Sequence, residues 1–349
     1  MLVLVMIMSS STSTSRATEA WLQRVREHRA TKEVVSIFST EGATSIHFCV
    51  YDVGAKICNQ ILGLKGKDMR IQFASDLHLE KWPKTTPDET LQPVAPVLAL
   101  LGDVAPLTQP NLLSFLEWCS ERWETILWIP GNAEVWNSGE VGYSAAVGRM
   151  KQIASSFANI QVLDRDAMMS EDGVMILACP LWYRPIENLM LHYKEKVWVK
   201  AEPPPTDPDV LLRCYEANVK WLKEKIQSVR ATPIVILSYY GPLSWVLEEE
   251  WIQNPELATS IPEMEQLMRE PVVAWAFGHC HRTVEHVYSW SGATGHTSDV
   301  FLTSNPRGFP EDLNEFRKEA VLRIDPDLYK KSFTHKGPYP TESINLFMG

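Results

Sequence analysis

The segment 69–80 constrains the fold most, because an apolar run ends there in Asp76 and His78, two positions apart. Three later apolar runs also end in polar side chains: Gly102-Asp103, Gly131-Asn132 and Gly278-His279-Cys280-His281. Carboxylate, imidazole and amide groups are the ligands that borderline divalent metals use. The sequence therefore predicts neighbouring buried strands with a metal site beyond their ends.

From residue 69 onward, short apolar runs rich in β-branched residues alternate with amphipathic stretches, a pattern typical of an α/β domain. Apolar side chains recur at helical spacing in 112–119, 147–157 and 212–226, and Pro208 suits the first turn of the third helix. The expected strands are 70–75, 97–101, 126–129, 160–163, 174–179, 234–238, 272–277, 286–290, 300–304 and 320–324.

Three regions follow from this pattern. Residues 1–68 form an extension of unknown role, in which 17–29 suits a short helix and 46–52 a strand. Residues 69–325 form the α/β domain, and 326–349, rich in Lys, Pro and Gly, are expected to be a tail.

The balance of charges favours a small substrate over extended nucleic acid. The net charge is -10, whereas binding to a phosphate backbone depends on clustered Lys and Arg. Six cysteines scattered through 349 residues indicate reduced thiols and an intracellular compartment, with the cytoplasm as the expected location. Cys280 lies between two histidines, where an extended segment turns it to the opposite face, so we expect a core residue rather than a ligand.

The amino end is apolar over residues 1–8 only, far short of the roughly 20 residues that span a bilayer. No membrane span is therefore expected. Serines, threonines and arginines follow, as in organelle transit peptides, while Glu19 and Glu27 argue against one. Organelle targeting, a disordered lead-in and an upstream artefact of gene prediction remain alternatives.

Taken in chain order, these motifs and Ser238-Tyr239-Tyr240-Gly241 resemble those of the calcineurin-like metallophosphoesterases. The resemblance covers residues 69–325. It implies an α/β fold, a four-layer α-β-β-α sandwich of two mixed sheets with helices outside. It also implies metal-dependent hydrolysis of a small phosphomonoester or phosphodiester.

The resemblance further implies two divalent ions, Mn, Fe or Zn, sharing one bridging carboxylate. By position, it assigns the first ion to Asp76, His78, Asp103 and His281, and the second to Asn132 and His279, with Asp103 as the bridge. Catalytic roles fall to Asn132, to His279 and to the position of Ala133.

Two positions depart from the family pattern. Ala133 stands where the family has the histidine that protonates the leaving oxygen, and loss of a general acid typically costs about 10²–10⁴ in rate. Tyr239 stands where a histidine should complete the second metal site. We expect an intact first site and a weak or empty second one, with ligation of Fe(III) by Tyr239 as the alternative. His286 and His296 lie close enough in sequence to be candidates for rescue.

Two explanations fit these departures: a substituted form of an active phosphoesterase, or a natural member losing activity. A different class of function also fits, since the retromer subunit that shares the implied fold lacks the catalytic histidine and acts as a protein-interaction scaffold. Retention of all six implied ligands favours the enzyme, and a protein partner is expected only if the chain is inactive.

Candidate substrate contacts lie in the loops near the motifs. Trp136 and Tyr240, with Trp182 and Tyr183, are candidates for stacking on a nucleobase or aromatic leaving group, and core packing is the alternative. Arg307, in Ser304-Asn305-Pro306-Arg307-Gly308, is a candidate phosphate contact, with an exposed turn as the alternative.

Overall fold

The structure is a computed structural model that describes residues 68–136, 138–140, 142–182, 208–229, 231–243, 264–292, 297–312, 314–326 and 344–347. The chain divides into two units between Lys67 and Asp68, and all described residues belong to the second. The predicted helix at 17–29 and strand at 46–52 lie outside the described residues.

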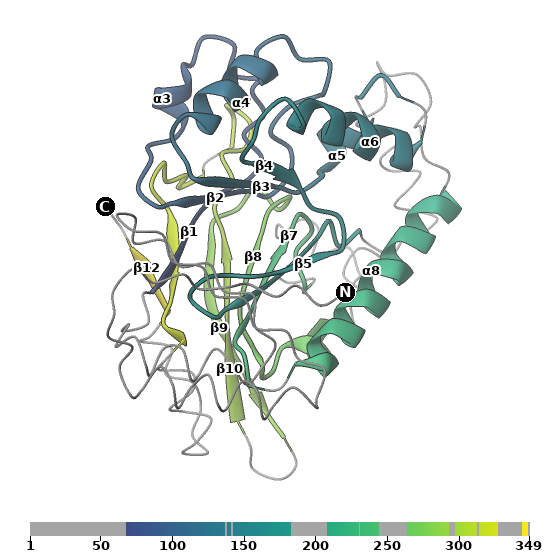
Figure 1. The fold of residues 1–349 in the computed structure, drawn as a ribbon, viewed down its shortest axis with the longest axis vertical. Helices are drawn as coiled ribbons and strands as arrows, with labels where there is room; N and C mark the ends of the chain where they lie inside the picture. Colours follow the sequence, from purple (N-terminus) through teal and green to yellow (C-terminus); the bar gives the residue numbers. More distant parts are fainter. Residues whose placement is uncertain are drawn as a thin grey trace, which may run out of the picture. The chain divides into compact units, whose positions relative to one another are not determined.

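Two six-stranded mixed sheets form the centre of this unit (Figure 1). The first has the order β12-β11-β1-β2-β3-β4, and the second β5-β6-β7-β8-β10-β9. The strands of the first sheet are β1 (Met69–Ala74), β2 (Val97–Leu100), β3 (Thr125–Trp128), β4 (Ile160–Val162), β11 (Val321–Ile324) and β12 (Ile344–Phe347). Those of the second are β5 (Asp166–Met169), β6 (Met175–Cys179), β7 (Ile234–Ser238), β8 (Val272–Phe277), β9 (Val284–Ser291) and β10 (Thr297–Ser304).

Each sheet contains four parallel strands, with antiparallel pairing on one side of them in the first sheet and on both sides in the second. Strands β1 to β4 run parallel, as do β6, β7, β8 and β10. The parallel strands are near-continuous apolar runs, and β7 and β8 are buried along their whole length, as expected for strands covered on both faces. Side chains of both sheets belong to one hydrophobic core.

Helices lie on the outer faces of the sheets. Helix α4 (Leu112–Ser120) packs against β3 and α6 (Tyr143–Ala154) against β4, while α8 (Pro208–Ser228) packs against β6 (Figure 1). Shorter elements are α3 (Pro87–Thr90), α5 (Asn132–Trp136) and the 3-10 helix η3 (Met264–Leu267). Among the described helices, none combines the length and the apolar character that a bilayer crossing requires.

The predicted α/β sandwich of two mixed sheets is confirmed. All ten expected strands and all three expected helices form, although several bounds differ by a few residues. The expectation of a tail after residue 325 was wrong for 344–347, which form β12 on the edge of the first sheet by pairing with β11. Strand β5 was also not foreseen.

Candidate metal centre

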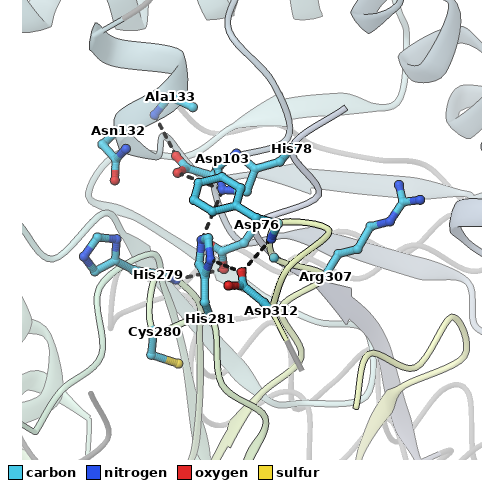
Figure 2. Close-up of polar contacts among 12 residues, drawn as sticks. Asp76, His78, Asp103, Asn132, Ala133, His279, Cys280, His281, Arg307 and Asp312 are labelled. Carbon is cyan, nitrogen blue, oxygen red and sulfur yellow. Dashed lines mark hydrogen bonds and ion pairs between the residues drawn. The ribbon is translucent and has the colours of Figure 1, made fainter. Parts of the chain in front are cut away.

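The polar motifs lie at the carboxyl ends of parallel strands, where α/β sheets usually bind ligands. Asp76 and His78 follow β1, Asp103 follows β2 and Asn132 follows β3, while Tyr239 follows β7 and His279 and His281 follow β8. Because the two sheets carry these ends to one place, side chains far apart in sequence converge (Figure 2). The structure thus brings all six implied ligands into one region.

Five of these residues have left-handed backbone conformations: Asp76, His78, Asp103, His279 and His281, with φ between 43° and 65°. Residues other than glycine rarely adopt such angles, and each typically costs about 1–3 kcal/mol unless the surroundings impose it. Backbone strain concentrated at one cluster of polar residues is typical of a functional site.

Main-chain hydrogen bonds hold these turns in place. The N–H of Asp76 donates to the Gly102 carbonyl and that of His78 to the Asp103 carbonyl, both at 3.0 Å. A third bond joins the two sheets, because the His279 N–H donates to Asp76 Oδ2 at 2.9 Å. The loops after β1, β2 and β8 therefore position one another.

Asp76, His78 and His281 form a cluster whose candidate ligand atoms all lie within 4.8 Å of one another. Nε2 of His78 lies 3.2 Å from Nε2 of His281. Carboxylate oxygens face the same point, since Asp103 Oδ2 lies 3.7 Å from His78 Nε2 and Asp76 Oδ1 lies 3.6 Å from His281 Nε2. Asp76 Oδ1 is buried without a hydrogen-bond partner.

Two further carboxylates orient the imidazoles. Nδ1 of His78 lies 3.0 Å from Glu80 Oε1, and Nδ1 of His281 lies 2.6 Å from Asp312 Oδ2. An ionised carboxylate only accepts hydrogen bonds, so each Nδ1 donates, and in the neutral imidazoles each Nε2 presents a lone pair toward the other. Carboxylates commonly orient metal-binding histidines in this way. The donor set therefore fits one cation between the two imidazoles.

Asp103 is held beside this cluster through the helix α5 turn. Its Oδ1 accepts the Ala133 N–H at 2.7 Å. Burial, followed by the nearby Glu134 and Asp76 carboxylates, raises the pKa of Asp103 well above its usual range. A cation at the site would offset this repulsion between buried carboxylates.

Glu134 is a structural residue rather than a ligand. Its carboxylate accepts the N–H groups of Gly131, Asp103 and Val104 at 3.0, 2.9 and 2.7 Å, and the Trp128 indole N–H at 3.3 Å. It thereby ties the end of β3 to the Asp103 turn. Gly131 is required at this junction, because a Cβ there would collide with Asp103 and Glu134.

The region implied for a second ion is arranged differently. The Tyr239 hydroxyl forms a short hydrogen bond with Asn132 Oδ1 and lies 2.9 Å from Nδ1 of His279. Burial lowers the pKa of His279 to about 3, with help from His281 and His78, and raises the pKa of Tyr239 well above its usual range. A neutral phenol thus joins the two side chains that the resemblance assigns to a second ion.

Comparisons with known proteins found matches at low identity. No protein-family model matches the chain. An uncharacterized protein of Acanthamoeba polyphaga mimivirus is 22% identical over 288 residues, covering 74% of this chain and 98% of that protein. Among solved structures, phosphopantetheinyl hydrolase of Mycobacterium tuberculosis is 17% identical, covers 71% of this chain and 92% of its own, and has a TM-score of 0.49. A dimetal phosphatase of Danio rerio is 11% identical, with 73% and 92% covered and a TM-score of 0.42.

The architecture agrees with the one that the sequence resemblance to the calcineurin-like metallophosphoesterases implies. It has two mixed sheets with helices outside, and the motifs lie at the carboxyl ends of parallel strands. This architecture places the candidate site beyond the ends of β1, β2, β3 and β8.

The candidate substrate contacts have different environments. The Arg307 guanidinium lies 4.3 Å from the Trp82 ring and donates to Thr90 Oγ1 at 3.2 Å, and burial lowers its pKa to about 10. Tyr240 is buried, with its ring centroid 4.2 Å from that of His279 and 5.5 Å from that of Trp182. This places Tyr240 in the core, the alternative considered from the sequence.

The other aromatic candidates differ in burial. Trp182 is fully buried, and half-buried Trp136 packs near it, with ring centroids 6.2 Å apart. Tyr183 lies outside the described residues. Only Trp136 of these candidates therefore retains partial exposure in the structure.

Cys280, His286 and His296 were also considered from the sequence. The Cys280 thiol donates to the Arg282 carbonyl at 3.1 Å and points away from the ligand cluster, as a core residue (Figure 2). His286 lies exposed on β9, and His296 lies outside the described residues.

Sequence reasoning did not identify Glu80, Glu134 or Asp312. Glu80 lies two residues after His78, and that spacing was a usable signal. Asp312 carried none, because a loop brings it to His281 from 31 positions away. Phe309, in the same loop, was also missed, and its ring centroid lies 4.5 Å from that of His78 and 4.6 Å from that of His281.

Proposed function

We propose that this chain is a metal-dependent phosphoesterase acting on a small phosphomonoester or phosphodiester, with catalysis impaired at Ala133 and Tyr239. The ligands proposed for its cation are Asp76, His78, Asp103 and His281. One observation carries the proposal: two imidazoles present Nε2 lone pairs to each other at 3.2 Å, with buried carboxylate oxygens beside them. Two unprotonated nitrogens at this distance repel unless a cation or a proton lies between them.

A divalent cation held there would supply positive charge to a phosphoryl oxygen and lower the pKa of water. The chain's own residues set its position. Glu80 and Asp312 contact Nδ1 of His78 and His281, which leaves Nε2 of each imidazole facing the cation, and Glu134 fixes the Asp103 loop. Phe309 covers one side of both imidazoles, which limits the approach of water from that side. The Ala133 methyl group donates no proton to a leaving oxygen, which accounts for the impairment.

Arg307 is proposed as a contact for the phosphate group of the substrate. Its loop pairs with the end of β1, since the Arg307 N–H donates to the Ser75 carbonyl at 3.0 Å and the Gly308 N–H to the Asp76 carbonyl at 2.9 Å. The guanidinium is therefore carried by a loop that is hydrogen-bonded to the turn containing the ligand Asp76. Stacking on Trp82 leaves its edges able to bind an anion.

An intracellular, reducing location, with the cytoplasm proposed, agrees with the cysteines. The four within the described residues, Cys119, Cys179, Cys214 and Cys280, are all free thiols.

The test restores both missing histidines. The double variant Ala133→His with Tyr239→His should raise hydrolysis of an aryl phosphodiester by at least about 100-fold over the unchanged chain. The two single variants separate the contributions. If purified protein supplied with Mn, Fe and Zn in turn binds less than half an equivalent of every one, the proposed cation site is wrong.

A protein-interaction scaffold is the second candidate, favoured by the methyl group of Ala133 and by the hydrogen bonds that Tyr239 makes in place of a second ion. The same double variant distinguishes the two. A folded, metal-loaded double variant without any gain against phosphomonoesters, phosphodiesters and nucleotides would favour the scaffold.

A further inference from the structure

We propose that this site holds a single cation, because the Tyr239 hydroxyl permanently takes the place of a second one. The inference deepens the proposed function and rests on it for the first cation only. Two observations indicate that Tyr239 does not fit a dinuclear site: the contacts of its hydroxyl group and the packing of its ring.

The hydroxyl lies between the two side chains that a second cation would need. It contacts Asn132 Oδ1 and Nδ1 of His279 at once. Metal bonds to such nitrogen and oxygen atoms are about 2.0–2.2 Å long, so a cation bound by both would lie between them, where the phenolic oxygen is. The hydroxyl instead donates its one hydrogen to Asn132 Oδ1 and is left to accept a hydrogen bond from Nδ1 of His279.

The Tyr239 ring is packed so that the hydroxyl cannot swing aside. Tyr239 is fully buried, and its ring lies against the backbone of Gly102, where a Cβ would collide with it. On another side the Tyr240 ring packs edge-on at 4.8 Å between centroids. The Tyr239 carbonyl is also held, because it accepts the Gly278 N–H at 2.9 Å. A tyrosine side chain has only two rotatable bonds, and this environment fixes both.

The histidine ligands of the first cation are oriented without this phenol. His78 and His281 take their orientation from Glu80 and Asp312, while the Tyr239 hydroxyl also interacts with the carboxylate of Asp103. The single-cation site is therefore complete without Asn132 or His279. Those two residues serve as hydrogen-bond partners of Tyr239.

Binding of Mn²⁺ to the purified full chain tests this proposal, with calorimetry for stoichiometry and electron paramagnetic resonance for the spin state. The unchanged protein should bind one equivalent and give the spectrum of an isolated Mn²⁺ ion. Tyr239→His should bind two equivalents and give the spectrum of a spin-coupled pair. Tyr239→Phe, the matched control that lacks the hydroxyl and supplies no ligand, should bind one.

Three results would overturn the proposal. Two equivalents in the unchanged protein would refute the single-cation site while leaving the phosphoesterase proposal intact. No binding at all would refute both. A visible phenolate-to-iron charge-transfer band on adding Fe(III), present in the unchanged protein and absent from Tyr239→Phe, would show that Tyr239 is a ligand.

A second variant keeps the test decisive if Tyr239→His does not fold. Asn132→Ala removes a side chain that a dinuclear site requires and that a single-cation site does not. The single-cation proposal expects one Mn²⁺ equivalent with affinity within about threefold of the unchanged protein. A tenfold or larger loss would contradict it.

Discussion

His78 and His281 lie 203 positions apart in the sequence, yet their Nε2 atoms face each other at 3.2 Å. One follows β1 of the first sheet and the other β8 of the second. Each imidazole has a carboxylate at its opposite nitrogen, which leaves both facing nitrogens as acceptors. This pair gives the site a strong requirement for positive charge, from which the first prediction follows.

Removing the carboxylate behind His281 should weaken the cation site without removing a ligand. Asp312→Asn is expected to lower the affinity for Zn²⁺ or Mn²⁺ by about 10–100-fold, since an amide no longer fixes the tautomer. Titration calorimetry measures the change. Asp299→Asn is the matched control, because Asp299 bonds only to exposed Ser289 on the neighbouring strand, and equal losses in both variants would refute the orienting role.

Adding a methyl group at Gly131 should disturb the Asp103 carboxylate. A Cβ at this position would collide with Asp103 Oδ1 and the Asp103 N–H, so the loop must shift. We expect Gly131→Ala to lower cation affinity at least about tenfold and stability by about 1–3 kcal/mol. Calorimetry and chemical denaturation measure the two effects.

The control is Gly148→Ala on helix α6, where an added Cβ meets nothing within 4 Å. Alanine is the better helix former, so stability should rise by about 0.5–1 kcal/mol with unchanged affinity. An unchanged affinity in Gly131→Ala as well would show that the Asp103 loop tolerates the shift.

Glu134 should contribute to folding whether or not a cation is bound. Its removal leaves three backbone N–H groups and one indole N–H buried without their partner. We expect Glu134→Ala to lower the free energy of unfolding of metal-free protein by about 2–4 kcal/mol. Urea denaturation with a chelator present measures it. Exposed Glu121→Ala should change stability by less than about 0.5 kcal/mol, and a similarly small change at Glu134 would contradict this role.

Burial of His279 predicts a dependence of stability on pH. Its pKa is about 3 in the folded chain and about 6.5 when exposed, so between these values the unfolded state binds one more proton. The contribution of neutral His279 to the free energy of unfolding is therefore fully present above about pH 6.5. It falls as the pH drops toward 3, by up to about 1.4 kcal/mol per pH unit.

Denaturation of metal-free protein across this range tests the expectation. His279→Asn keeps a side-chain N–H for Tyr239 and removes the titrating group, so the slope of stability against pH between 6.5 and 3 should fall by the equivalent of about one proton. Exposed His286→Asn is the control and should leave the slope unchanged. The burial argument fails if His279→Asn and the unchanged protein give parallel curves.

Sequence patterns predicted the buried strands well and missed β5 and β12. Strands β7 and β8 are uninterrupted apolar runs, a pattern typical of parallel strands that are buried on both faces. Strand β5 is largely exposed, so its side chains show no apolar alternation. Strand β12 lies in a region rich in Lys, Pro and Gly, where pairing with β11 overrides composition.

The site was predictable where residue type and strand end coincide, as at Asp76 and His281. The orienting carboxylates were not, because their roles arise from loop paths such as that joining Phe309 and Asp312 to His281. Nor did the sequence alone reveal the hydrogen bonds of Tyr239. That required the positions of Asn132 and His279 in space.

The bond from the His279 N–H to the Asp76 carboxylate joins the two sheets at their ligand-bearing ends. The first sheet supplies Asp76, His78 and Asp103, and the second supplies His281. The complete set of four ligands therefore needs both halves. A bound ion would thus link the two sheets. Amide hydrogen exchange in the innermost strands should therefore be slower when the ion is bound.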